Sequence, residues 1–211
     1  MAPQPTIDTD RLVLRPFELA DAPHVQRLAG VRDIADTTLH IPHPYPDGAA
    51  AEWIKTHGLA WERGAGVTFA VTLRDTTALI GAIGLDIATH SSWGELGYWV
   101  AVPSWNRGYC TEAAQALLAL GFSQLRLHRI QARHLTRNPS SGRVMQKIGM
   151  RLEGVHREAV RKWDRFEDLA VYGILAAEWK ADDDTASAAA PGVASVASMP
   201  SATSRLTNDG N

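Results

Sequence analysis

One stretch of the sequence, residues 93–122, constrains the fold more than any other. In its first part, Leu96, Tyr98 and Val100 alternate with single intervening residues, and this period of two is typical of a half-buried strand, with one covered face. In its second part, apolar residues lie three or four positions apart, as one face of a helix requires. These residues are Ala114, Leu117, Leu118, Gly121 and Phe122. The stretch therefore predicts a strand, a tight turn and a helix.

The turn has the composition of an anion-binding site. Residues 106–111 supply Gly108 for close backbone approach, Arg107 for positive charge and the Thr111 hydroxyl where the helix begins. The first N–H groups of a helix have no partner within it, and the positive end of its dipole points the same way. We therefore expect a pyrophosphate to bind at this turn.

The longer phrase around the turn points to a known family. GELGYWV followed by WNRGYCTEA closely resembles the strand and acyl-CoA loop of the GCN5-related N-acetyltransferase (GNAT) superfamily, in its ribosomal-protein N-terminal acetyltransferase (RimJ/RimL-like) branch. The phrases TDRLVLRPFELADA and RFEDLAVYGILAAEW resemble the same branch, so the resemblance covers residues 6–180. At the position of Cys110 the superfamily has Gly or Ala, which are smaller.

The resemblance implies the GNAT fold. This is an α/β (α+β) structure with a mixed, mostly antiparallel sheet, flanking helices and a splayed central strand pair that binds acyl-CoA. Counting period-two segments gives about seven strands. They are expected at residues 11–17, 67–73, 78–87, 95–101, 129–135, 151–156 and 169–175, with helices at 22–28, after 47, after 108 and at 138–148. Residues 1–180 form one predicted domain.

Residues 181–211 form an Ala/Ser-rich tail that we expect to be disordered, because it has too few apolar groups to offset its ordering entropy. Four aspartates against one arginine give this tail a charge of −3, which leaves +1 of the total −2 for residues 1–180. A near-neutral domain has no excess of positive charge, so the composition does not indicate nucleic-acid binding.

Other classes of protein and site are also disfavoured by composition. A single cysteine excludes an intrachain disulfide framework, and neither a signal peptide nor a membrane-spanning run is present, so we expect a cytoplasmic protein with no membrane partner. The eight histidines show no metal-ligand spacing, so we predict no metal. The sequence excludes neither a monomer nor a homodimer.

Two residues are candidates for catalysis in acetyl transfer. The resemblance places Glu95 on the strand that approaches the thioester, where it would act as general base directly or through water; the alternative is a surface carboxylate. Ser141 matches a serine of this branch and would hydrogen-bond the departing thiolate, whereas many relatives carry a tyrosine at the position of Met145. The alternative is an ordinary serine at a helix start.

The resemblance also implies residues for both substrates. Asn138 matches an asparagine that holds the pantetheine amide, with a plain helix cap as the alternative. The residues expected to bind acyl-CoA are Trp99, Val100, Ala101, Asn106, Arg107, Gly108, Tyr109, Cys110, Thr111 and Asn138. The candidate contacts for the acceptor lie in the loop before residue 47 and in the helix that follows it: His40, His43, Tyr45 and Trp53. For the two histidines, the alternative is that they are exposed loop residues.

The function implied is that of an acetyl-CoA-dependent N-acetyltransferase acting on a primary amine. We expect a protein N-terminal α-amine, because its pKa near 8 leaves far more unprotonated amine at neutral pH than the value of about 10.4 for lysine. Two alternatives stay open: a small-amine or antibiotic acetyltransferase of the same fold, and a catalytically weak acyl-CoA-binding module.

Overall fold

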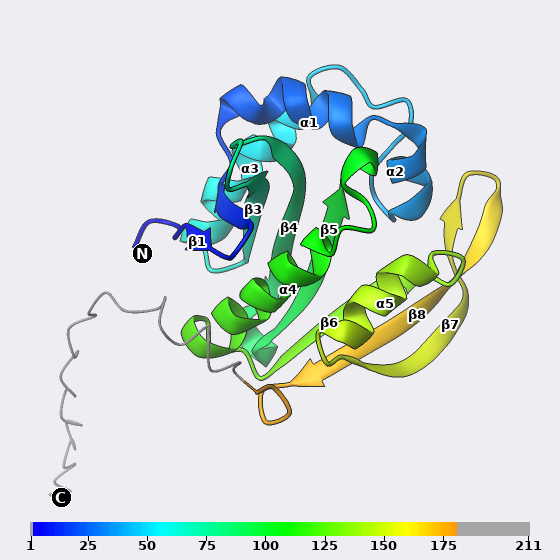
Figure 1. The fold of residues 1–211 in the computed structure, drawn as a ribbon. Helices are drawn as coiled ribbons and strands as arrows, with labels where there is room; N and C mark the ends of the chain where they lie inside the picture. Colours follow the sequence, from blue (N-terminus) through cyan, green and yellow to red (C-terminus); the bar gives the residue numbers. More distant parts are fainter. Residues whose placement is uncertain (1, 181–211) are drawn as a thin grey trace, which may run out of the picture.

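The computed structural model describes residues 2–180 as one open sheet with helices packed on it (Figure 1). The sheet has eight strands in the order β1-β2-β3-β4-β5-β6-β8-β7. Every neighbouring pair is antiparallel except β5 and β6, which are parallel. The mixed, mostly antiparallel α/β fold expected from the sequence is confirmed. Our expectation for the tail at 181–211 lies outside the described residues.

The strands agree with the predicted ones apart from their ends and one addition. The two-residue strand β1 was not predicted, because so short a segment shows no alternation, and the hairpin of β7 and β8 extends beyond the predicted segments. The strands are β1 (Ile7–Asp8), β2 (Leu12–Pro16), β3 (Gly66–Leu73), β4 (Leu79–Ala88), β5 (Trp93–Val100), β6 (Arg129–Leu135), β7 (Arg151–Lys162) and β8 (Arg165–Leu175).

The helices cover both faces of the central strands. They are α1 (Ala22–Ala29), α2 (Arg32–Thr37), α3 (Ala49–Glu62), α4 (Tyr109–Ala119) and α5 (Pro139–Lys147). In Figure 1, α4 and α5 lie in front of the sheet. The predicted helices are confirmed, whereas α2 was missed because six residues are too few for a helical period. No helix within residues 2–180 has the length and apolarity needed to span a membrane.

Two hydrophobic clusters hold these layers together. On one face, Leu117 and Leu118 of α4 pack with Leu96 of β5 in the larger cluster. On the other face, residues of α1, α2 and α3 pack around Trp99 of β5. Leu96 and Trp99 point to opposite sides of one strand, so β5 is covered on its second face at Trp99 as well, although the alternation predicted one covered face. Gly97, on the same face as Trp99, stays exposed.

The parallel strands β5 and β6 separate partway along their length. Their registered pairs run from Trp93 with Arg129 to Leu96 with Ala132 and then stop. Beyond these pairs, β5 continues to Val100 and β6 to Leu135, and Figure 1 shows the two strands diverging. The expected splayed central strand pair is therefore present, and it opens a gap in the middle of the sheet.

Candidate functional site

A cavity of about 970 Å³ lies where β5 and β6 diverge. From the face that carries α4 and α5, it is lined by Cys110, Ser141 and Met145. From the opposite face, it is lined by Asp86 and Glu95. Since successive residues of a strand point to opposite faces, one compartment reaches both sides of the sheet through the splay. We call its two sides the α4/α5 half and the acidic half.

The turn before α4 has the geometry of an anion site. Gly108 precedes the helix with φ of 80°, a left-handed conformation that disfavours any side chain. The first hydrogen bond of the helix runs from the Glu112 N–H to the Gly108 carbonyl at 3.1 Å. The N–H groups of residues 109–111 therefore have no partner within the helix, and all three residues line the cavity. Asn106 and Gly108 line it as well.

Arg11, which sequence reasoning missed, supports this turn from the start of the chain. Its guanidinium pairs with the Glu112 carboxylate at 2.6 Å and donates to the Arg107 carbonyl at 3.0 Å. Glu112 sits in the first turn of α4, so pairing it with Arg11 offsets a negative charge that would repel an anion. The Arg107 side chain is exposed and does not line the cavity.

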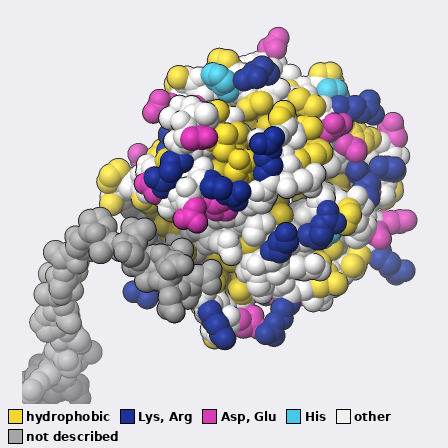
Figure 2. Space-filling model, in the orientation of Figure 1, with side chains coloured by type: hydrophobic (Ala, Val, Ile, Leu, Met, Phe, Trp, Pro, Cys, Tyr) yellow, Lys and Arg dark blue, Asp and Glu magenta, His cyan; other side chains and the backbone are white. Residues whose placement is uncertain are grey.

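Helix α5 brings further positive charge to the cavity. Arg143 and Lys147, four residues apart, both line it. Figure 2 shows several Lys and Arg side chains on the face that carries α4 and α5. These cations, together with the start of α4, make the α4/α5 half suited to phosphate groups.

Ser141 meets a tyrosine that comes from the sheet rather than from its own helix. The Tyr98 hydroxyl lies 2.8 Å from Ser141 Oγ and donates to the Ser141 carbonyl at 3.2 Å. Burial raises the pKa of Tyr98 well above its usual value, so the phenol stays neutral. Met145, at the position where many relatives of the family carry a tyrosine, is buried in the core. A hydroxyl pair thus occupies the splay without a tyrosine from α5.

Trp99, Val100 and Ala101, at the end of β5, direct their backbone N–H and C=O groups to different sides of the strand. The Ala101 N–H donates to the Ile80 carbonyl at 2.7 Å. In an antiparallel pair, every second residue directs its N–H and C=O groups toward the partner strand, so Trp99, two residues earlier, also directs these groups toward β4. Val100 directs its backbone toward the gap, and there its carbonyl accepts the Trp105 indole N–H at 2.6 Å. Of the three predicted backbone contacts, the Val100 N–H is the one that faces the gap.

Cys110 lines the cavity as an inert thiol. Burial raises the pKa of Cys110 to about 12. The group is therefore protonated at neutral pH.

The acidic half contains two carboxylates with different surroundings. Asp86 of β4 lies directly opposite Glu95 of β5, so both point to the same side of the sheet. Glu95 accepts from Arg133 at 2.6 and 2.7 Å and from Gln131 at 3.1 Å. Within residues 2–180 no hydrogen bond or ion pair reaches the Asp86 carboxyl, which the sequence analysis did not single out.

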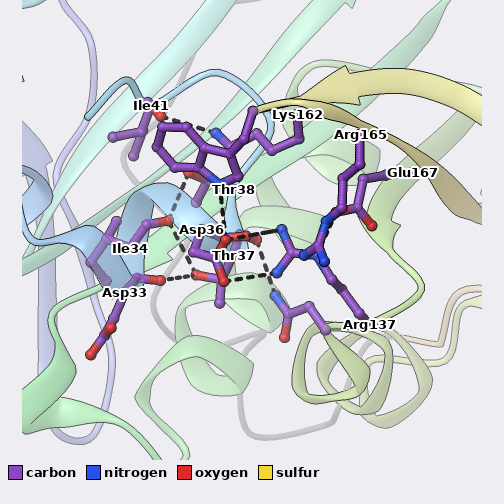
Figure 3. Close-up of polar contacts among 12 residues, drawn as sticks. Asp33, Ile34, Asp36, Thr37, Thr38, Ile41, Arg137, Lys162, Arg165 and Glu167 are labelled. Carbon is purple, nitrogen blue, oxygen red and sulfur yellow. Dashed lines mark hydrogen bonds and ion pairs between the residues drawn. The ribbon is translucent and has the colours of Figure 1, made fainter. Parts of the chain in front are cut away.

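A polar network holds α2 against the strands and loops beyond the cavity (Figure 3). Arg137, just after β6, binds the Asp36 carboxylate at 2.9 Å and the Asp36 carbonyl at 2.7 Å, and it pairs with the buried Glu167 at 2.8 Å. The Trp163 indole donates to Asp36 at 3.0 Å. This hydrogen bond and the contacts with Arg137 hold the pKa of Asp36 below its usual value. We call these four residues the α2 clamp.

Two further contacts extend the α2 clamp along the cavity wall. The Asn138 side chain donates to the Thr37 carbonyl at 3.1 Å, and Lys162 donates to the Ile41 carbonyl at 3.2 Å. Residues 37–41 line the cavity, so these contacts position that wall. The Asn138 side-chain oxygen also accepts the Ser141 N–H at 3.4 Å, which confirms it as the cap of α5. Its predicted contact with pantetheine stays a prediction.

Some of the residues predicted to contact the acceptor line the cavity, and the others lie outside it. Trp53 and His40 line the cavity. His43 and Tyr45 do not: the His43 ring lies 3.0 Å from the Gly30 carbonyl, and Tyr45 packs against the cluster around Trp99. Among the described residues, no group of His, Cys, Asp or Glu side chains could hold a metal ion.

Comparison with known proteins agrees with this geometry. The model of the acetyltransferase (GNAT) domain matches residues 11–151. The chain is 37% identical over 179 residues to the N-acetyltransferase YnaD of Bacillus subtilis, covering 82% of this chain and 98% of that protein.

Two solved structures share the fold at lower identity. One is RimL, a ribosomal L7/L12 α-N-protein acetyltransferase in complex with coenzyme A, with a TM-score of 0.75, 16% identity and coverage of 81% and 98% of the two chains. The other is the microcin C7 self-immunity acetyltransferase MccE with acetyl-CoA and AMP, with a TM-score of 0.71, 17% identity and coverage of 79% and 93%. At these identities the likeness concerns the fold alone.

Proposed function

The chain belongs to the GNAT acetyltransferase family, and on that premise we propose that it transfers the acetyl group of acetyl-CoA to a primary amine, specifically a protein N-terminal α-amine. The observation that carries the proposal is the cavity at the splay of β5 and β6. Its α4/α5 half presents free N–H groups and cations, and its acidic half presents carboxylates. An anionic cofactor and a cationic acceptor would thus meet from opposite faces of the sheet.

In this proposal the α4/α5 half binds coenzyme A. The pyrophosphate lies over residues 106–111, and Arg143 and Lys147 provide positive charge for phosphate groups. The pantetheine follows the gap, where the Val100 N–H is directed. Gly108 matters because the backbone must come close to the phosphate.

The chemical step then takes place in the splay. The amine nitrogen forms a bond to the thioester carbonyl carbon, the C–S bond breaks, and the sulfur leaves with the electron pair. The Ser141 hydroxyl can accept a hydrogen bond from the Tyr98 hydroxyl and donate one to the developing thiolate. The amide nitrogen keeps one hydrogen, and the other proton of the amine passes to the thiolate, which gives the free thiol of coenzyme A.

An arriving ammonium must first lose one proton to a base, because a protonated amine has no lone pair. Glu95 is our sequence-based candidate for this base, and the structure offers Asp86 directly opposite it. Either carboxylate lies in the acidic half, where we place the acceptor.

The choice of an N-terminal α-amine rests on its pKa near 8 and on the resemblance to the ribosomal-protein branch. Because acetyl-CoA and nascent proteins occur together in the cytoplasm, this choice agrees with our expectation of a cytoplasmic location. A small-molecule amine is the second candidate, because the carboxylates of the acidic half would pair with the ammonium group of a small amine as well.

The experiment is an acetylation assay with purified full-length protein. Acetyl-CoA is supplied with short peptides that have free N-termini, with the same peptides N-acetylated, and with small primary amines, while thiol release and product mass are followed. We expect thiol release that depends on the free α-amine and adds one acetyl group. Release with small amines alone would select the second candidate, and tight CoA binding without any transfer would indicate a binding module.

A further inference from the structure

Asp86 and Glu95 form a cross-strand pair whose members have unequal environments. Residues directly opposite on neighbouring antiparallel strands have Cβ atoms about 5 Å apart. Arg133 and Gln131 together engage both oxygens of Glu95. Asp86 receives no such contact within residues 2–180, although it lines the same cavity. One carboxylate is already paired, and the other is open to a ligand.

The space beside the pair is open at Gly97. Gly84 and Gly97 form the next cross-strand pair on the same face, and both line the cavity. A Cβ added to Gly97 would meet no atom within 4 Å. A small cationic group can therefore reach the pair along this floor without displacing a side chain.

We infer that Asp86 is the residue that binds the ammonium of the acceptor and takes its first proton, while Glu95 is a positioning residue that holds Arg133 and Gln131. This inference rests on the proposed amine acetyltransfer. It assigns to the acidic half a preference for primary amines that arrive as cations. The ammonium forms a charge-assisted hydrogen bond to Asp86, passes one proton to that carboxylate and becomes the neutral nucleophile.

The surroundings of Asp86 suit this role. Asp86 is exposed to the cavity, and the atoms around it still remove enough hydration to raise the pKa of its carboxyl; the charge of Glu95 raises this pKa further. His40, across the cavity, acts in the opposite direction. Arg133 is directed to Glu95 rather than to Asp86. A carboxylate with a raised pKa is a better base toward an amine than an ordinary surface aspartate.

The test measures discrimination between charged and uncharged acceptors. Wild type, Asp86→Asn and Glu95→Gln, each saturated with CoA, are titrated by calorimetry with the best peptide of the acetylation panel and with its N-acetylated form. A second pair of probes is n-pentylammonium and n-pentanol. We expect wild type to prefer the cation and Asp86→Asn to lose about ten- to a hundredfold of that preference, as for one lost hydrogen bond to a charge. Glu95→Gln should lose less.

A second readout is the pH profile of kcat/KM. In wild type, Asp86 deprotonates the bound ammonium, so kcat/KM should stay high below the pKa of the acceptor amine and fall only as Asp86 itself becomes protonated. In Asp86→Asn only the neutral amine can react, so kcat/KM should fall steadily as pH drops below the pKa of the acceptor. Unchanged discrimination in Asp86→Asn, or a larger loss in Glu95→Gln, would overturn the inference while leaving acetyl transfer by wild type intact. If the CoA complex of wild type transfers to no amine and prefers neither cation, the inference and the proposed function both fail.

Discussion

The two halves of the cavity are built in different ways. The α4/α5 half depends mainly on one continuous segment, in which β5 leads through a tight turn into α4. The acidic half and its wall are assembled from β4, β5, β6, α2 and the hairpin of β7 and β8. Arg137 and Asp36 in the α2 clamp are 101 residues apart in the chain. A site for a common cofactor can therefore be encoded locally, whereas the acceptor site depends on long-range contacts.

The largest expected effect comes from a side chain at Gly108. Gly108→Val should weaken CoA binding by about a hundredfold or more, because the side chain fills the approach to the free N–H groups and φ of 80° is costly for it. Calorimetry with CoA measures the affinity, and thermal unfolding checks that the variant is folded.

Gly97→Ala is the matched glycine control in the acidic half. Its methyl group enters open space, so CoA affinity and the melting temperature should stay unchanged while the KM for the acceptor rises. Equal CoA affinity in wild type and Gly108→Val would remove the pyrophosphate from this turn. A loss of CoA affinity in Gly97→Ala would show that the two halves are not separate.

Ser141→Ala tests the departure of the thiolate. Removal of one hydrogen bond to a developing charge, worth about 1.5 to 3 kcal/mol, should lower kcat about ten- to a hundredfold with little change in CoA affinity. The effect should depend weakly on pH. Tyr98→Phe should give a smaller loss, because it removes only the partner that orients Ser141. An unchanged kcat in Ser141→Ala would leave the serine as a structural residue of α5.

Arg137→Ala tests the α2 clamp. Loss of its contacts with Asp36 and the buried Glu167 should cost about 1 to 3 kcal/mol of unfolding free energy, or roughly 2 to 10 °C in melting temperature. The KM for the acceptor should rise more than the KM for acetyl-CoA. Arg143→Ala is the contrasting variant: within residues 2–180 this exposed arginine makes one polar contact, to Ser140, and it lines the α4/α5 half, so it should raise the KM for acetyl-CoA and leave the melting temperature nearly unchanged. If Arg137→Ala raises only the KM for acetyl-CoA, the clamp serves the cofactor instead.

The clamp also predicts a pH dependence of stability. Because the pKa of Asp36 is lower in the folded state, its contribution to stability is present above the unfolded value of about 3.9 and is lost as pH falls through the folded value. Asp36→Asn should therefore reduce the difference in melting temperature between pH 6 and pH 3. If Asp36→Asn shows the same difference in melting temperature between pH 6 and pH 3 as wild type, Asp36 does not contribute to the pH dependence of stability.

The smallest effect is expected for removal of residues 182–211. The sequence of this segment has no apolar stripe, so melting temperature and kcat/KM should stay nearly unchanged. A decrease of several degrees in melting temperature would show that the segment stabilises the domain.

The fold and the α4/α5 half could largely be predicted from the sequence. The alternation in β5, the glycine before α4 and the cap of α5 by Asn138 are local signals, and the structure has all three. The alternation in β5 predicted one covered face, and this was wrong at Trp99, which helices bury on the second face. That burial depends on tertiary packing, which the pattern of one strand does not contain.

The acidic half was less predictable. Asp86 becomes notable only when the register places it opposite Glu95, and the local sequence of β4 does not give that register. Arg11 pairs with Glu112, a partner 101 residues away, so no local pattern could have shown it. One signal was available: Asp86 is the charged residue within an otherwise apolar predicted strand, although its side chain is exposed in the structure.

The central claim is that one cavity through the sheet takes the cofactor from one face and the amine from the other. Its most direct test is the calorimetric affinity of a bisubstrate ligand in which the sulfur of CoA is joined through an acetyl bridge to the N-terminal nitrogen of a peptide. Because both halves would be filled by one molecule, we predict binding about a hundredfold or more tighter than that of CoA. Binding no tighter than that of CoA would contradict the account.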